Sequence, residues 1–91
     1  MKYEIQKTTQ FKKDFKLALK RNCDINKLRE VITILANGET LPEIYKDHAL
    51  NGSYCGYREC HIEPDWLLIY KITKDVLILT LYRTGTHSDL F

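Results

Sequence analysis

The stretch from Cys60 to Lys71 reads CHIEPDWLLIYK, and it places a histidine, two carboxylates and a tryptophan around a proline, ahead of the most apolar run of the chain. Pro64 and Asp65 are residue types favoured at the second and third positions of a type I turn. We therefore predict a β-hairpin whose turn runs from Glu63 to Trp66, with these two residues opposite each other. The rest of the chain is expected to assemble around this hairpin.

Strand alternation gives the predicted hairpin two faces of different character. Its pairing places Ile62 opposite Leu67 and His61 opposite Leu68. The face expected to enter the core holds Cys60, Ile62, Leu67 and Ile69. The face expected to carry chemistry holds Glu59, His61, Glu63, Trp66, Leu68 and Tyr70.

Length and composition point to a small cytoplasmic domain. The 91 residues are too few for two independent cores, so a single domain spanning residues 1–91 is expected. The three cysteines are odd in number and follow no pairing pattern, which favours free thiols in a reducing cytoplasm. No apolar run approaches the roughly 18–20 residues of a membrane span, and the first residues lack the apolar segment of a signal peptide.

The remaining periodicity predicts a strand, a helical hairpin and a meander of strands. Residues 2–6 alternate polar and apolar as a half-buried strand does, and the apolar spacing then becomes helical. Thr8 or Thr9 is expected to cap the first helix and Asp24 the second, with Gly38 just past its end. Further strands are predicted at 57–63, 66–72 and 76–83. The predicted fold class is α+β: a helical hairpin packed on one face of a mostly antiparallel sheet of about four strands.

Positive charge is concentrated in the first predicted helix. Against the single acid Asp14, this part of the chain carries Lys7, Lys12, Lys13, Lys16, Lys20 and Arg21. Such an excess is either an ordinary solvated helix face or a surface that attracts a polyanion or an acidic protein.

The three histidines, His48, His61 and His87, are separated by whole predicted elements, so no two have the spacing of metal ligands on one helix. The nearest approach to a metal motif combines Cys55, Cys60 and His61, and it is weak because Cys60 and His61 are predicted on opposite faces. The chain has no phosphate-binding glycine loop, nucleophile elbow or dinucleotide fingerprint. We therefore expect no metal and no cofactor, which leaves acid–base chemistry or simple binding.

The residue types at the predicted strand ends suit cleavage of RNA by its own 2′-hydroxyl. Histidine, with an unperturbed pKa of about 6.5, both accepts and donates protons near neutral pH. In this reaction one group removes the 2′ proton, another protonates the leaving 5′ oxygen, and a cation stabilises the added charge on phosphorus. Stacking on unpaired bases is open to several aromatic side chains: Tyr57, Trp66, Tyr70 and Phe91.

Four blocks of sequence carry a resemblance to a known family. They are Tyr45-Lys46-Asp47-His48-x-Leu50-x-Gly52-Ser53, Gly56-Tyr57-Arg58, the run from His61 to Lys71, and Arg83-Thr84-Gly85-Thr86-His87-x-x-Leu90-Phe91. In these blocks, and over essentially its whole length, the chain resembles the YafQ-like branch of the RelE/ParE superfamily of bacterial toxins, which implies a RelE-like fold.

This resemblance implies a metal-independent, ribosome-dependent endoribonuclease that cuts the mRNA codon in the ribosomal A site. It implies catalytic roles for His48, His61, Asp65 and His87, and substrate binding by Trp66, Arg83 and Phe91. Asp65 or His48 is expected near the 2′-hydroxyl and His87 near the leaving oxygen.

The resemblance also implies partners: mRNA on the ribosome, ribosomal RNA, and a cognate antitoxin protein that occludes the basic surface or the cleft. Ribosomal RNA is expected to contact Lys12, Lys13, Lys16 and Lys20. Two alternatives remain open from the sequence. One is a non-enzymatic toxin on the same fold that binds gyrase, since a fold does not settle a function. The other is a basic RNA-binding module without turnover.

Overall fold

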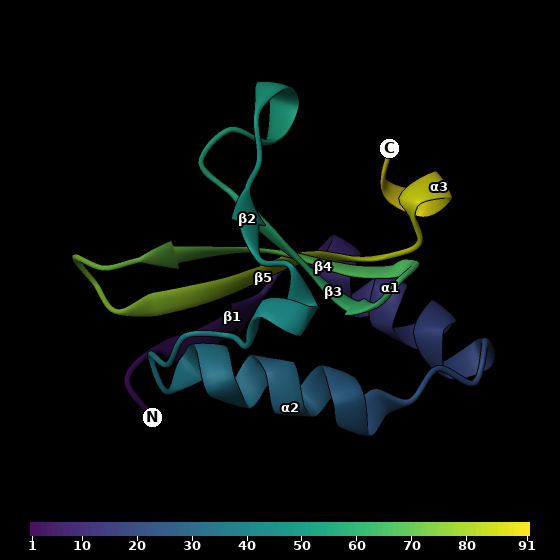
Figure 1. The fold of residues 1–91 in the computed structure, drawn as a ribbon, viewed down its shortest axis with the longest axis horizontal. Coiled ribbons are helices and arrows are strands. Elements are labelled where there is room, and N and C mark those ends of the chain that lie inside the picture. Colours follow the sequence, from purple (N-terminus) through teal and green to yellow (C-terminus); the bar gives the residue numbers. More distant parts are fainter.

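The structure, a computed structural model, describes residues 1–91 as a five-stranded sheet of order β1-β5-β4-β3-β2 with a helical hairpin on one face (Figure 1). The strands are β1 Glu4–Lys7, β2 His48–Ala49, β3 Arg58–Glu63, β4 Trp66–Thr73 and β5 Ile78–Gly85. The helices are α1 Thr9–Lys20, α2 Ile25–Ala36 and α3 His87–Leu90, with short 3-10 turns at Glu43–Tyr45 and Gly52–Tyr54. None of the helices is both long and apolar enough to cross a membrane.

The predicted fold class is confirmed, with one strand more than expected. β1 pairs parallel with β5, and every other pairing is antiparallel. The additional strand is β2, whose two residues pair with β3. A strand this short leaves no periodic pattern in the sequence, so the connection from residue 39 to 56 gave no sign of it.

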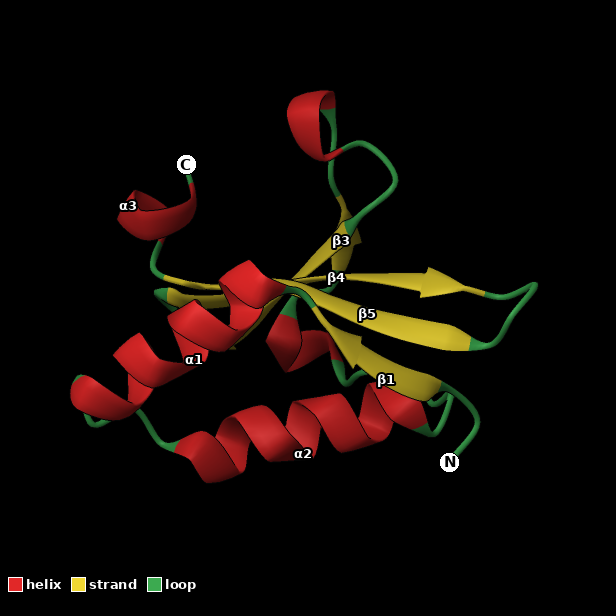
Figure 2. Cartoon of the chain, turned by 180° about the vertical axis from the view of Figure 1, so that it is seen from behind, coloured by secondary structure: helices red, strands yellow, loops and turns green.

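Local sequence signals set the ends of the helical hairpin. The Thr8 side chain accepts a hydrogen bond from the Phe11 amide, and the Asp24 side chain accepts one from the Asn26 amide, so both helices have the N-caps expected of them. Asn22, in the turn between the helices, has a left-handed φ of 59°. Figure 2 shows α1 and α2 together on one side of the sheet, with α3 beyond the other side.

β4 is buried on both faces and separates two hydrophobic clusters. From Trp66 to Tyr70 every residue is buried. Trp66, Leu68 and Tyr70 pack in the main core beneath the helices. Leu67 and Ile69 point the other way and form a smaller cluster with Leu90 of α3.

A β-bulge changes the register that the sequence predicted for the hairpin. Glu63 does lie opposite Trp66, but His61 lies opposite Leu67 rather than Leu68, and the irregularity falls between His61 and Glu63. The extra residue shifts β3 by one position against β4, and such a shift exchanges the faces of the paired residues. The prediction was right for Cys60 and Ile62, which enter the core. It was wrong for the residues of β4, which face the opposite way: Trp66, Leu67, Leu68, Ile69 and Tyr70.

Candidate active site

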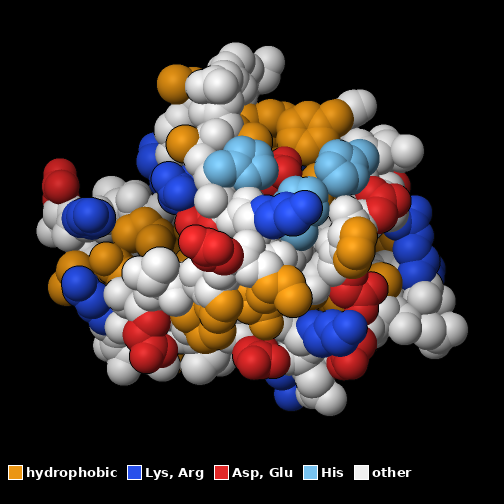
Figure 3. Space-filling model, in the orientation of Figure 1, with side chains coloured by type: hydrophobic (Ala, Val, Ile, Leu, Met, Phe, Trp, Pro, Cys, Tyr) orange, Lys and Arg blue, Asp and Glu red, His pale blue; other side chains and the backbone are white.

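The three histidines gather on the face of the sheet opposite the α1–α2 hairpin. His48 comes from β2, His61 from β3, and His87 begins α3. The ring centroids are 6.3 Å apart for His48 and His61, and 5.7 Å apart for His61 and His87. Figure 3 shows the three imidazoles next to one another on one face of the molecule. The segment before β3, the β3–β4 hairpin and the C-terminal segment thus bring together the three histidines for which the resemblance implies catalytic roles.

A buried carboxylate lies beneath two of these rings. Glu59 is 5% exposed, and its Oε1 atom lies 3.5 Å from Nε2 of His48 and 3.4 Å from Nε2 of His61. Glu59 was predicted to lie on the chemical face of the hairpin, with no role of its own. The sequence did contain a signal for a contact between Glu59 and His61, because residues two apart on a strand lie on the same face.

The Nδ1 atom of each histidine faces an oxygen atom. The acceptor is the Lys46 carbonyl for His48 at 2.8 Å, the Pro64 carbonyl for His61 at 3.3 Å, and Asp65 Oδ1 for His87 at 2.7 Å. A carbonyl or carboxylate oxygen only accepts, so Nδ1 carries the hydrogen and Nε2 is left as the reactive nitrogen. All three rings therefore present Nε2 for proton transfer or for binding a metal.

Asp65 orients His87 from the turn between β3 and β4. Its Oδ1 atom accepts from both the backbone N–H of His87, at 3.0 Å, and the ring Nδ1–H, at 2.7 Å. These hydrogen bonds, the backbone one first, lower the pKa of Asp65 below its ordinary value. The carboxylate therefore stays ionised at neutral and mildly acidic pH and stabilises a positive charge on the His87 ring.

The short helix α3 is held at its start and at its end. Thr86 and Asp89 form a reciprocal capping box, and Asp89 also accepts from Arg21 of α1 at 2.6 Å. This guanidinium contact is the main reason that the pKa of Asp89 falls to about 2. At the other end the Tyr54 hydroxyl donates to the Leu90 carbonyl at 3.0 Å. His87 is thus fixed relative to the sheet although α3 is a single turn.

Of the predicted substrate-binding aromatics, one is buried and one is open. The Trp66 side chain is 5% exposed in the main core, and its Nε1–H donates to Thr84 Oγ1 at 3.0 Å. Trp66 was expected on the chemical face and in contact with substrate, but the one-residue shift at the bulge turns the indole toward the helices and into the core. Phe91 packs edge to face on Tyr54, with the ring centroids 5.3 Å apart. Its side chain is still 62% exposed, so it is free to contact a ligand.

Arg83 lies in a second polar cluster, on the α1 side of β5. Its Nε and Nη2 atoms donate to the two carboxylate oxygens of Asp14 at 3.0 and 3.1 Å. Asp14 is 8% exposed and also accepts from the Thr84 amide at 3.2 Å. The guanidinium expected to face a phosphate is therefore already neutralised by a bidentate partner.

Glu59, His61 and His87 could also hold a metal ion. One ligand atom from each lies within 4.8 Å of the others. Two imidazoles and a carboxylate suit a transition ion such as Cu²⁺ or Zn²⁺. The combination of Cys55, Cys60 and His61 does not form a metal site. Cys60 is buried in the core, where desolvation raises the pKa of its thiol to about 12.

Comparison with known proteins places this chain within one class, the bacterial toxins of type II toxin-antitoxin systems. A family model described as "Bacterial toxin of type II toxin-antitoxin system, YafQ" matches residues 3–91. The "mRNA interferase toxin YafQ" of Escherichia coli strain K12 is 52% identical over 89 residues, which cover 97% of this chain and 95% of the relative. The chain therefore belongs to the YafQ family, and the predicted family is confirmed.

Two solved structures add information about such proteins. The toxin in a crystal structure of the E. coli DinJ-YafQ complex is 51% identical and superimposes with a TM-score of 0.90, covering 98% of both chains. A structure described as a metal-bound toxin from Helicobacter pylori is 42% identical, with a TM-score of 0.92 over 98% of this chain and 99% of that one.

The donor set predicts binding of copper at the histidines. Titration of the protein with Cu²⁺, followed by calorimetry, should show one site per chain that is weakened at least about tenfold in His61→Ala, since that variant loses a ligand. Cys55→Ser, which removes an exposed thiol, serves as the control and should bind as wild type does. Weaker binding in Cys55→Ser but not in His61→Ala would place the ion at the cysteine instead.

Proposed function

We propose that the chain is the toxin of a type II toxin-antitoxin system and acts as an endoribonuclease, an mRNA interferase that cuts codons exposed in the ribosomal A site. The observation that carries this proposal is the convergence of three imidazoles on one open face, with the Nε2 atoms of His48 and His61 at Glu59 and the His87 ring beside that of His61. The name of the E. coli relative, which is 52% identical, supports the same activity.

The reaction begins with attack of a 2′-hydroxyl oxygen on the adjacent phosphorus. A base removes the hydroxyl proton as the new O–P bond forms, and an acid gives a proton to the 5′ oxygen as the old P–O bond breaks. The products are a 2′,3′-cyclic phosphate and a free 5′-hydroxyl. The chain's part is to hold a base and an acid on opposite sides of the phosphorus, with positive charge near its oxygens.

His87 is best suited to be the acid. Its Nδ1–H is held by the ionised Asp65 carboxylate, which stabilises the protonated ring, so that Nε2–H is available to the leaving oxygen. Asp65 itself is less suited to act as base, because His87 already occupies its Oδ1 atom with two hydrogen bonds.

His48 is the better candidate for the base. Its Nε2 atom faces the 2′ side of the site in this assignment, and Glu59 stabilises the charge that the ring gains with the proton. His61 shares the same carboxylate and, when protonated, supplies positive charge to the phosphate oxygens. This places on His61 the role that was expected of Arg83, whose guanidinium is bound to Asp14.

No metal takes part in the proposed reaction. A transition ion on Glu59, His61 and His87 would occupy a ring nitrogen of the proposed acid, His87, and we therefore expect it to inhibit. The metal-bound H. pylori toxin is compatible with such occupancy in a relative.

Other parts of the molecule are proposed to position the substrate and the partners. Phe91, with its exposed ring, would stack on an unpaired base. Ribosomal RNA would contact the exposed lysines of α1: Lys12, Lys13, Lys16 and Lys20. A cognate antitoxin is proposed because the E. coli relative was crystallised with DinJ. The protein would act in the cytoplasm, where ribosomes and mRNA are found.

The gyrase-binding alternative gains nothing from the relatives, whose names refer to mRNA. The site also disfavours an RNA-binding module without turnover. A binding surface needs cations, whereas here the imidazoles have fixed tautomers and a buried carboxylate behind them.

His87→Ala should lower the rate of mRNA cleavage by roughly 10²- to 10⁴-fold, the usual contribution of a general acid. Mapping of mRNA 5′ ends after a brief pulse of expression would show breaks within codons for wild type and few for the variant. Asp75→Asn, an exposed change in the turn between β4 and β5, is the matched control and should cleave normally. Unchanged cleavage in His87→Ala, or growth arrest with intact mRNA and damaged DNA, would contradict the proposal.

A further inference from the structure

Asp47, the residue before His48, is held by side chains from two strands. Its carboxylate accepts a hydrogen bond from the Tyr70 hydroxyl of β4. Its Oδ2 atom also accepts from Nη2 and Nε of Arg58, at the start of β3, at 3.1 and 3.3 Å. The next residue along the chain, His48, has its Nε2 atom 3.5 Å from Glu59. A tightly bonded residue therefore comes directly before one of the three histidines.

Strand pairing explains why Asp47 and His48 lie on opposite faces of the sheet. Arg58 and Tyr70 are opposite each other in the β3–β4 pair, and Tyr70 packs in the main core beneath the helices. Asp47, which bonds to both side chains, therefore lies on the helical side of the sheet. Successive residues of an extended chain point to opposite faces, so His48 is directed to the other side, where it meets His61.

The backbone alone constrains this segment weakly. β2 is two residues long and forms an edge of the sheet, so it can make only a few hydrogen bonds to β3. The side chain of His48 is 50% exposed, and little packs around it. Segments with few buried contacts open easily. The hydrogen bonds of Asp47 therefore add a constraint that so short a strand does not supply.

One peptide group connects this constraint to the imidazole. The Lys46 carbonyl belongs to the same peptide group as the Asp47 amide, and it faces Nδ1 of His48 at 2.8 Å. Lys46 has a left-handed φ of 50°, a conformation that residues other than glycine seldom adopt. Such a conformation persists where the surrounding structure holds it in place. Fixing Asp47 thus fixes the acceptor that selects the tautomer of His48.

We infer that Asp47, held by the Tyr70 hydroxyl, is a positioning residue for His48. It keeps the imidazole in the tautomer with hydrogen on Nδ1, so that Nε2 faces Glu59 and the substrate. The effect originates in the core, because the Tyr70 side chain is 1% exposed and reaches Asp47 through its hydroxyl. This inference rests on the proposed function, in which His48 is the base.

Tyr70 has the properties that an anchor requires. Burial, followed by contact with Asp47, raises the pKa of its hydroxyl above the ordinary value, so the hydroxyl keeps its proton and remains a donor. Its ring is fixed in a strand that is buried on both faces, and rigid elements hold a site more precisely than loops do. A displacement of about 1 Å at a reacting group can lower a rate by about 10²-fold. Loss of the hydroxyl should therefore be visible in the rate.

Tyr70→Phe removes the hydroxyl and leaves the ring in the core. We expect kcat for mRNA cleavage on ribosomes to fall at least about tenfold, with KM within about twofold, because the base is displaced while the binding surfaces are unchanged. Asp47→Ala removes the other half of the contact from a loop residue, and it should have the same effect on kcat. Circular dichroism would verify that each variant is folded at the assay temperature.

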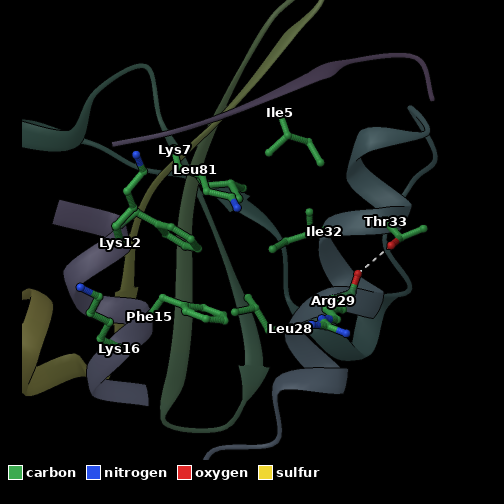
Figure 4. Close-up of a pocket in the computed structure, with 11 residues that line it drawn as sticks. Ile5, Lys7, Lys12, Phe15, Lys16, Leu28, Arg29, Ile32, Thr33 and Leu81 are labelled. Atoms are coloured by element: carbon green, nitrogen blue, oxygen red, sulfur yellow. Dashed lines mark hydrogen bonds between the residues drawn. The ribbon is translucent and has the colours of Figure 1, made fainter. Parts of the chain in front are cut away.

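Two control variants separate positioning from loss of a hydroxyl or of stability. Tyr3→Phe removes a hydroxyl from another buried ring of the main core. Ile5→Ala weakens packing on β1, the opposite edge of the sheet from β2, where Ile5 lines a groove with side chains of α1 and α2 (Figure 4). Neither control should lower kcat by more than about twofold, because neither residue bonds to Asp47.

The tautomer of His48 gives a readout that a purely structural role would not change. Spectra of protein with ¹⁵N-labelled histidine would be recorded well above the ordinary histidine pKa of about 6.5, so that neutral rings are compared. His48 of the wild type should show a single tautomer with hydrogen on Nδ1. Tyr70→Phe and Asp47→Ala should show a mixture of the two tautomers, whereas Ile5→Ala should match the wild type.

A double variant tests whether Tyr70 acts through His48. In a His48→Ala background the group to be positioned is absent, so adding Tyr70→Phe should lower the residual cleavage rate by less than about twofold. Likewise, Tyr70→Phe should add little to Asp47→Ala, since the two changes break the same contact.

Three results would overturn the inference. One is an unchanged His48 spectrum in both Tyr70→Phe and Asp47→Ala. Another is a loss of kcat in Tyr3→Phe or Ile5→Ala as large as in Tyr70→Phe. The third is an equal loss from Tyr70→Phe with and without His48. The spectrum requires neither substrate nor ribosome, so it tests the positioning role even if the proposed reaction is wrong, and failure of that reaction would appear in the His87→Ala experiment.

Discussion

The contact of the buried Glu59 carboxylate with the histidines is the constraint on which the site depends. The Glu59 side chain is 5% exposed. Burying a carboxylate to this extent costs on the order of several kcal/mol in hydration free energy, which interacting partners must offset. Here His48 and His61 approach the same oxygen, at 3.5 and 3.4 Å. The cost of burying Glu59 is thereby linked to the two rings that the proposed function uses.

The sheet makes this arrangement possible because β4 is buried on both of its faces. The face toward α1 and α2 contains most of the hydrophobic core and the network of Asp14, Arg83 and Thr84. The opposite face needs only a small cluster around Leu67, Ile69 and Leu90, and the rest of it is free to carry ionisable groups. The main core and the candidate site are thereby placed on different faces of the sheet.

Local patterns predicted much of this structure, and the failures share a cause. Caps at Thr8 and Asp24 and the turn at Pro64 act over a few residues, so the sequence shows them directly. The bulge beside Ile62 has no such signal in the sequence. Its one-residue shift places Trp66 in the core and not on the predicted chemical face. Arg83 and Asp14, 69 residues apart, are joined only by the packing of α1 on β5. A common site for the three histidines was implied by the family resemblance, whereas the place of Glu59 beneath them depends on burial that the sequence does not show.

The central claim is that these histidines and Glu59 perform metal-free acid–base catalysis, and the pH dependence of single-turnover mRNA cleavage on ribosomes tests it most directly. Rates would be measured at constant Mg²⁺, to keep the ribosomes intact, with a chelator selective for transition metals. We predict a bell-shaped profile, as expected for one base and one acid, unaffected by the chelator and with Glu59→Gln lowering its maximum. Activity lost to the chelator and restored by Zn²⁺ or Cu²⁺ would contradict the account.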